Sequence, residues 1–269
     1  MRDNSSLIKE FILIIAVFSG VFIIWNFVFL AGLIFGVDIG ENKDFFDNFE
    51  NLIFLTALTV DDGWSVSMFA ISESMVFMGL YGAYWYRRMD IDGIYYFVRQ
   101  PSRKKWILKT SLQLLGITAF WGLLQVGVPY ILSSLYTDTD FSFMTFLLFI
   151  IMYLSITLFN YFSVYLVNIF SMRYGTVISF IIVYCFYIFC FIGMSFTKDN
   201  RYPLAYFAPT EVTLVKWEDD IGSIKAFVDI NKSTIISLSV LAVYCMTLIF
   251  ITWCNVDKWD IGLKSRENV

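Results

Sequence analysis

Residues 143–170, FMTFLLFIIMYLSITLFNYFSVYLVNIF, decide the fold class of this chain. The stretch contains no Asp, Glu, Lys or Arg. About 20 apolar residues suffice to cross the hydrocarbon core of a bilayer as an α-helix. Within lipid the backbone must satisfy its own hydrogen bonds, and a helix does so within one segment. We therefore predict a transmembrane helix over these residues.

The composition of the whole chain agrees with a membrane protein. Of its 269 residues, 58 % are hydrophobic and only 16 % are charged, whereas soluble domains average about 45–50 % and about 25 %. So much apolar surface excludes a disordered chain. A formal net charge of −4 argues against a nucleic-acid partner. Histidine is absent and the four cysteines form no CxxC pair, so we expect no metal site and no catalytic residues.

Five other apolar stretches have the length of a membrane span. We therefore predict an all-α, polytopic membrane protein with a single transmembrane domain over residues 1–269. Its six predicted spans are residues 11–37, 66–86, 111–136, 143–170, 176–197 and 233–254.

The basic residues predict the orientation of this bundle. If the N-terminus is inside, most of the 19 Lys and Arg residues fall in segments that face the cytoplasm. These inner segments are residues 1–10, 87–110, 171–175 and 255–269. Because cytoplasmic loops carry an excess of Lys and Arg, both termini are expected to be cytoplasmic. Residues 38–63 and 198–232 are then the two large outer segments.

The inner segment between spans two and three carries the most specific pattern, YRRMDIDGIYYFVRQPSRKKWILKT over residues 86–110. Helical spacing predicts a short amphipathic helix whose apolar face is Ile91, Ile94, Tyr95 and Val98. Pro101 interrupts it, and Ser102 is a candidate N-cap for a second helix that begins at Arg103 and continues into span three. One interpretation is a basic loop attracted to anionic lipid headgroups. Another is a docking surface for a soluble partner.

This loop and the topology together resemble the membrane permease subunits of type-2 (ABC-2) ABC exporters. Members of that family have six spans, cytoplasmic termini and a coupling helix between spans two and three. The residues that the resemblance implies for coupling to an ATPase are Asp90, Asp92, Gly93, Ile94, Tyr95, Val98, Pro101 and Arg103. Ile94 stands where the family usually has Thr.

The resemblance implies partners that this chain would need. The chain contains no GxxxxGK[ST] phosphate-binding loop, so it is expected not to be an enzyme and to carry no cofactor. ATP and Mg would bind to a separate ATP-binding subunit, present in two copies, and a second permease chain, identical or homologous, would complete the pathway. The expected location is a bacterial cytoplasmic membrane, in contact with lipid. The expected cargo is an amphipathic or antimicrobial-type peptide, or a lipid or drug.

Four polar residues within the predicted spans are candidates for the translocation pathway, because an unpaired polar group in hydrocarbon is costly. They are Asn26, Glu73, Gln125 and Asn160. Counted from the cytoplasmic ends, Asn26, Glu73 and Gln125 fall at one depth and Asn160 lies nearer the inside. The alternative is that they hydrogen-bond between helices, or, for Glu73, that it lies at the interface.

Other classes remain open at this point. The chain could be a non-transporting toxin-immunity or sensor protein, or a secondary transporter with Glu73 as its coupling carboxylate. A membrane-embedded enzyme is disfavoured, because the chain has no His and no suitably spaced array of carboxylates.

Overall fold

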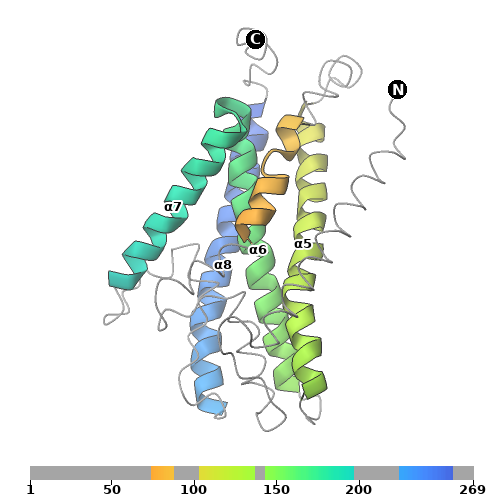
Figure 1. Cartoon of the computed structure of the whole chain (residues 1–269), viewed down its shortest axis with the longest axis vertical. Coiled ribbons are helices and arrows are strands. Elements are labelled where there is room, and N and C mark those ends of the chain that lie inside the picture. The colour runs from red at the N-terminus through yellow and green to blue at the C-terminus, as the bar shows by residue number, and fades with distance from the viewer. Residues whose placement is uncertain (1–73, 88–102, 137–142, 197–223, 257–269) are drawn as a thin grey trace, which may run out of the picture.

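The computed structural model describes residues 74–87, 103–136, 143–196 and 224–256 (Figure 1). These residues are helical and include no strand. Four long helices are α5 (Arg103–Tyr136), α6 (Phe143–Tyr174), α7 (Thr176–Phe196) and α8 (Ile224–Asn255). A shorter segment, residues 74–87, is helical over 74–81 and 84–87 and is broken at 82–83. The all-helical prediction is confirmed for this part of the chain.

Three of the described helices are long and apolar enough to cross a membrane. The spanning portions are Arg103–Ile131 of α5, Phe149–Tyr174 of α6 and Leu238–Asn255 of α8. The protein is therefore membrane-embedded. The predicted first span, residues 66–73 of the second, and the amphipathic helix of the 87–110 loop lie outside the described residues.

The helices extend beyond the predicted apolar spans. α5 begins at Arg103, so the basic end of the 87–110 loop is already part of the helix that crosses the membrane. α8 begins at Ile224, whereas the predicted span begins at residue 233. Its 32 residues make a helix of about 48 Å, which exceeds the ~30 Å hydrocarbon core. Hydropathy detects only the part of a helix that lies in lipid, so the polar first turns of α8 read as loop.

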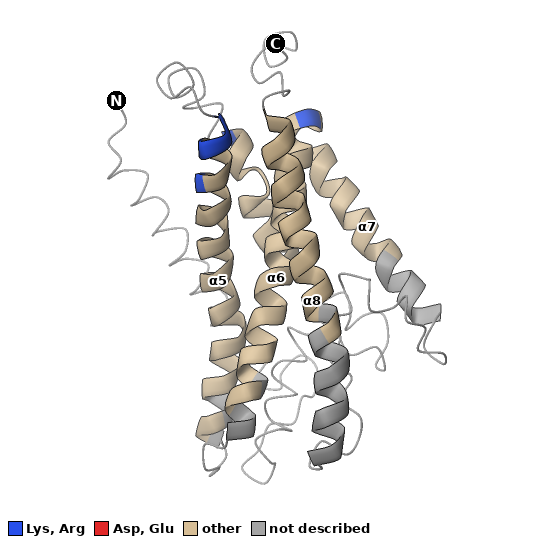
Figure 2. Ribbon diagram, turned by 180° about the vertical axis from the view of Figure 1, so that it is seen from behind, with Lys and Arg blue, Asp and Glu red and all other residues tan. Residues whose placement is uncertain are grey.

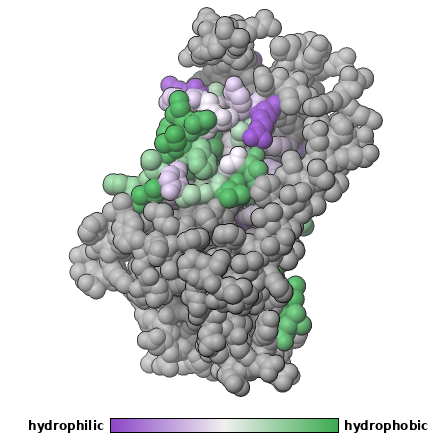
Figure 3. Space-filling view, in the orientation of Figure 1, coloured by the Kyte–Doolittle hydropathy of each residue, from purple (hydrophilic) through white to green (hydrophobic). Residues whose placement is uncertain are grey.

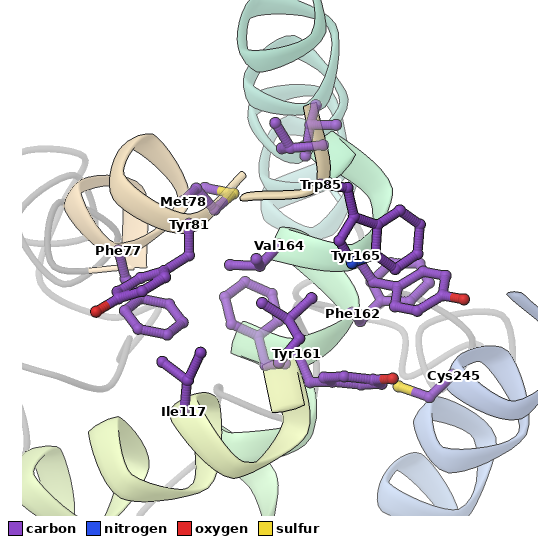
Figure 4. Close-up of a cluster of buried hydrophobic side chains, with 14 of the residues drawn as sticks. Phe77, Met78, Tyr81, Trp85, Ile117, Tyr161, Phe162, Val164, Tyr165 and Cys245 are labelled. Atoms are coloured by element: carbon purple, nitrogen blue, oxygen red, sulfur yellow. The ribbon is translucent and has the colours of Figure 1, made fainter. Parts of the chain in front are cut away.

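α6 is the central helix of the described bundle. It packs against α5, α7 and α8 (Figure 1), and the 74–87 segment also lies along it. Buried aromatic side chains fill the contacts, as Figure 4 shows. Phe77 stacks on Trp121 of α5 with ring centroids 5.2 Å apart, and Trp85 meets Tyr165 of α6 edge-on at 4.9 Å. Such offset and edge-to-face pairs add to the packing that holds helices together in lipid.

The outer faces of α7 and α8 are apolar and exposed. α7 diverges from the bundle along its length (Figure 1), and Figure 3 shows hydrophobic side chains across the upper part of one face of the molecule. The large exposed side chains of α7 are Val177, Ile178, Ile181, Ile182, Phe186 and Phe189. Such a surface fits an environment of lipid rather than water.

The described charges gather at one end of the bundle. Figure 2 shows Lys and Arg at the start of α5 and near the junction of α6 with α7. No Asp or Glu occurs among the residues whose side chains are described. The distribution agrees with the sign of charge expected on the cytoplasmic side.

A single residue, Gly175, connects α6 to α7. Its φ of 83° lies in the left-handed region, which glycine adopts without penalty and which commonly ends helices. Its amide donates to the Ser171 carbonyl at 3.1 Å, and its own carbonyl accepts the Ser179 amide at 3.3 Å. The inner segment expected over residues 171–175 is thus reduced to one residue, because α6 continues to Tyr174.

We expect Gly175→Ala to lower the free energy of unfolding by about 1 kcal/mol, because an L side chain disfavours this backbone conformation by about 1–2 kcal/mol. A Cβ at Gly175 would meet no atom within 4 Å, so the loss comes from the backbone alone. Gly175→Asn should cost less. Unfolding in mixed detergent micelles measures both. The matched control is Gly116→Ala within α5, where a Cβ also has open space; equal losses at the two glycines would contradict the prediction.

Candidate functional site

The structure describes three of the residues that the sequence proposed as functional. Gln125 and Asn160 lie in α5 and α6, and Arg103 is the first residue of α5. The other proposed residues lie outside the described part of the chain, namely Asn26, Glu73, Asp90, Asp92, Gly93, Ile94, Tyr95, Val98 and Pro101.

Gln125 and Asn160 contact each other between α5 and α6. The Asn160 Nδ2 donates a hydrogen bond of 2.7 Å to the Gln125 Oε1. Both side chains are buried, with 1 % and 0 % of their surface exposed. In this conformation the pair joins two helices and is enclosed by them.

This contact joins two residues that the count along the sequence placed at different depths. The count placed Asn160 nearer the cytoplasmic side than Gln125. A helical Cβ is tilted toward the N-terminus of its own helix, and α5 and α6 run in opposite directions, since Tyr130 meets Phe149 while Ser111 meets Tyr165. The two amide side chains therefore lean toward one another and bridge the difference in depth.

The surroundings of this pair contain polar atoms without a hydrogen-bond partner. Among the described residues, the Asn160 Oδ1 and the Thr157 Oγ1 are buried and unpaired. Gly122 of α5 lies directly against Thr157, because a Cβ built on Gly122 would collide with the Thr157 hydroxyl. The missing side chain lets the two backbones approach closely, as small residues do at helix contacts in membranes.

Asn168 of α6, which the sequence did not single out as functional, makes three hydrogen bonds through its side chain. Its Oδ1 accepts the backbone N–H of Trp85 at 2.8 Å. Its Nδ2 donates to the backbone carbonyls of Tyr81 and Val164, both at 2.8 Å. The side chain is fully buried. Asn168 therefore holds the broken 74–87 segment against α6.

Asn168 carries the same sequence signal as Gln125 and Asn160, because it is a polar residue in an apolar stretch. It lies near the end of the predicted span at residue 170, where a polar side chain is unremarkable, because the interface is wet. The structure continues α6 to Tyr174, which places Asn168 within the helix. It is also two turns from Asn160 and so lies on a similar face of α6.

Gly82 fixes how closely the 74–87 segment approaches α6. A Cβ at this position would lie 2.5 Å from the Val167 Cγ1 and 2.5 Å from the Met78 carbonyl oxygen. No real Cβ could occupy that space, so glycine is required for this conformation of the break.

The basic end of the bundle joins α5 to α8. The Lys104 Nζ lies 5.0 Å from the ring centroid of Trp253, within the range of a cation–π contact. The last residues before the undescribed 88–102 segment lie nearby, because the Trp85 and Trp106 rings are 6.4 Å apart. The end of the 74–87 segment and the start of α5 therefore lie close together at this end of the bundle.

Among the described residues there is no group of His, Cys, Asp or Glu side chains that could hold a metal ion. Comparison of the chain with protein-family models, curated proteins and solved structures finds no match. The function is therefore inferred from the residues of the chain and their geometry.

A double-mutant cycle with Gln125→Leu and Asn160→Leu should give a coupling energy between about 0.6 and about 1.7 kcal/mol, the range for hydrogen bonds between membrane helices. The reason is that the two amides bond each other directly. Unfolding of the single and double variants in mixed micelles measures it. As a control, Gln125→Leu combined with Ser179→Ala should be additive, because Ser179 bonds Gly175 at the α6–α7 junction. Additivity of the Gln125 and Asn160 variants would contradict the prediction.

Proposed function

We propose that this chain is the permease subunit of an ABC-2-type exporter in a bacterial cytoplasmic membrane. The observation that carries the proposal is the proximity of the two described elements that flank residues 88–102 in the sequence. Both elements pack on α6, and the rings of Trp85 in one and Trp106 in the other are 6.4 Å apart. The amphipathic helix that the sequence predicts between these two elements would then connect them at the basic end of the bundle, as a coupling helix does in the proposed family.

Each end of that segment is tied to the membrane part by a different element. On one side the chain continues from the broken 74–87 segment, which Asn168 holds. On the other side α5 begins at Arg103 and runs as one helix to Tyr136. In the proposed exporter, two ATP-binding subunits carry ATP and Mg and press on this segment when they close. The permease pair then changes its access from one side of the membrane to the other.

The proposed cargo is an amphipathic peptide, with a lipid or drug as the alternative. The apolar surfaces of α7 and α8 and the dense aromatic side chains are compatible with cargo of this class. Gln125 and Asn160 would serve as polar contacts only if α5 and α6 separate during transport, because they are enclosed in the conformation described.

The proposed orientation is testable with cysteines introduced at Asp47 and Asp219. We expect both to react with a membrane-impermeant maleimide added from outside, because the excess of Lys and Arg places the termini in the cytoplasm. The chain without the introduced cysteines is the control for its native thiols. Labelling of these positions only from the cytoplasmic side would overturn the topology.

Truncation of the apolar face of the 88–102 segment should uncouple the proposed complex. Tyr95→Ala and Ile94→Asp are each expected to weaken capture of the ATP-binding subunit at least about 30-fold, since anchor residues in a groove contribute about 2 kcal/mol or more. Co-purification of that subunit with the full chain, together with transport, measures the loss.

The control for this experiment is a variant in which Arg99 and Lys105 are replaced by neutral residues. It removes positive charge and leaves the apolar anchors in place. A helix resting only on lipid headgroups would respond mainly to that neutralisation. Intact capture in both apolar variants together with loss in the neutralised one contradicts the coupling assignment. Failure of any P-loop ATPase to co-purify with the wild-type chain contradicts the exporter itself.

A further inference from the structure

The break at residues 82–83 replaces one specific hydrogen bond of an α-helix. In an uninterrupted helix the Trp85 amide would donate to the Tyr81 carbonyl, four residues earlier. Here the Trp85 N–H bonds the Oδ1 of Asn168 at 2.8 Å, and the Tyr81 carbonyl accepts the Nδ2 of Asn168 at 2.8 Å. The side-chain amide of Asn168 has the donor and acceptor that these two groups require, and it is inserted between them.

The helical ladder continues on both sides of this insertion. The Gly82 amide donates to the Met78 carbonyl at 2.7 Å, and the Arg87 amide donates to the Ala83 carbonyl at 2.9 Å. Insertion of a side chain into the ladder is a recognised cause of a kink. The interruption is therefore local, and helical pieces that can realign lie on either side.

Two features show that the break at residues 82–83 is a defined conformation and not a frayed helix. Asn168 is held in place by its third bond, to the Val164 carbonyl of its own helix. Gly82 leaves room for Val167 and the Met78 carbonyl, where a Cβ would collide. The first feature orients the Asn168 amide toward the gap, and the second lets the broken segment approach α6 closely.

The broken form also leaves one polar group unsatisfied. The Trp85 side chain is fully buried, and its Nε1 has no hydrogen-bond partner in the described structure. Figure 4 shows Trp85 between the end of the 74–87 segment and Tyr165 of α6. An unpaired buried donor disfavours the conformation that contains it. The unpaired Nε1 of Trp85 therefore destabilises the broken form.

We propose that residues 82–83 are a two-state hinge whose switch is the Asn168 side chain. In one state, the one described, Asn168 occupies the gap and the segment is broken. In the other, Asn168 withdraws, the Trp85 amide bonds the Tyr81 carbonyl directly, and residues 74–87 form one straight helix. The same two backbone groups are satisfied in both states, so the exchange leaves neither of them unpaired.

The hinge lies directly before the 88–102 segment and would set the direction in which the chain enters it. That consequence rests on the proposed function, because the ATP-binding subunits would supply the push. The hinge itself needs no partner, and its test uses the isolated chain. Its failure is therefore distinguishable from a failure of ATPase capture.

The test follows the backbone amide of Trp85 by NMR in the full chain, labelled with ¹⁵N-tryptophan and reconstituted in lipid nanodiscs. Trp85→Phe assigns the resonance by its disappearance. Gly82→Ala and Asn168→Leu disfavour the broken form by unrelated means, one by collision and the other by loss of the bridging amide. We expect both variants to move the Trp85 resonance to one common new position.

The matched control is Gly79→Ala in the same segment, where a Cβ meets no atom within 4 Å. It should leave the Trp85 resonance at the wild-type position. In the wild type, relaxation dispersion of this amide should report exchange on the μs–ms timescale with a minor state of about 0.1–10 %. The chemical shift of that minor state should equal the common position of the two variants.

Different positions for the two variants would overturn the hinge, and so would the absence of exchange in the wild type. If one variant does not fold, the other still decides the question. Its Trp85 position must then coincide with the minor state that dispersion measures in the wild type, and a mismatch overturns the proposal.

Discussion

The side-chain amide of Asn168 is the polar contact that holds the broken 74–87 segment against the central helix α6. It joins three backbone groups from two elements that are far apart in sequence. In the broken form it gives a partner to both the Trp85 amide and the Tyr81 carbonyl, and unpaired backbone groups are costly within lipid. The position of residues 74–87, and so the start of the segment that follows them, is set by one residue of α6.

α6 takes this role because of the solvent around it. In a bilayer, burial of apolar side chains does not drive helices together, since lipid is as apolar as the core. Association depends instead on close packing and polar contacts between helices. α6 supplies both on several faces: Asn160 toward α5, Ser163 toward Tyr187 of α7, and Asn168 toward the broken segment. Its many buried polar residues are consistent with its central position.

The sequence predicted the type of secondary structure better than it predicted the ends of the helices and the contacts between them. Long apolar runs can only be helices in lipid, so the helices over 143–170 and 176–197 were expected, and the structure has α6 and α7 there. The ends of the helices were harder to predict, because the polar first turns of α8 lack the apolar signal. The single-residue connection at Gly175 was also missed, since a glycine two residues after Arg173 does not differ in composition from a loop.

At the candidate site, too, the sequence predicted which residues are notable better than it predicted their contacts. Gln125 and Asn160 were recognisable as polar residues in apolar runs, but their pairing depends on the direction in which helical side chains lean. Whether they contact cargo stays a prediction. Asn168 was overlooked because its importance lies in a break in another segment, and in the sequence of residues 74–87 only Gly79 and Gly82 are poor helix formers. A residue that completes the backbone of a distant element leaves little trace in its own neighbourhood.

The two ends of the 88–102 segment differ mechanically, and this has a consequence for the proposed exporter. α5 is helical without interruption from Arg103 to Tyr136, although Pro129 lies within it. A push on that end is transmitted along a rigid helix. The other end continues into a helix that is broken at 82–83, where a push can exchange one set of hydrogen bonds for another. The same closure of the ATP-binding subunits would thus displace α5 as a body while it realigns residues 84–87 relative to α6. Motion of the two elements against each other follows from this difference, even if the force on both ends is equal.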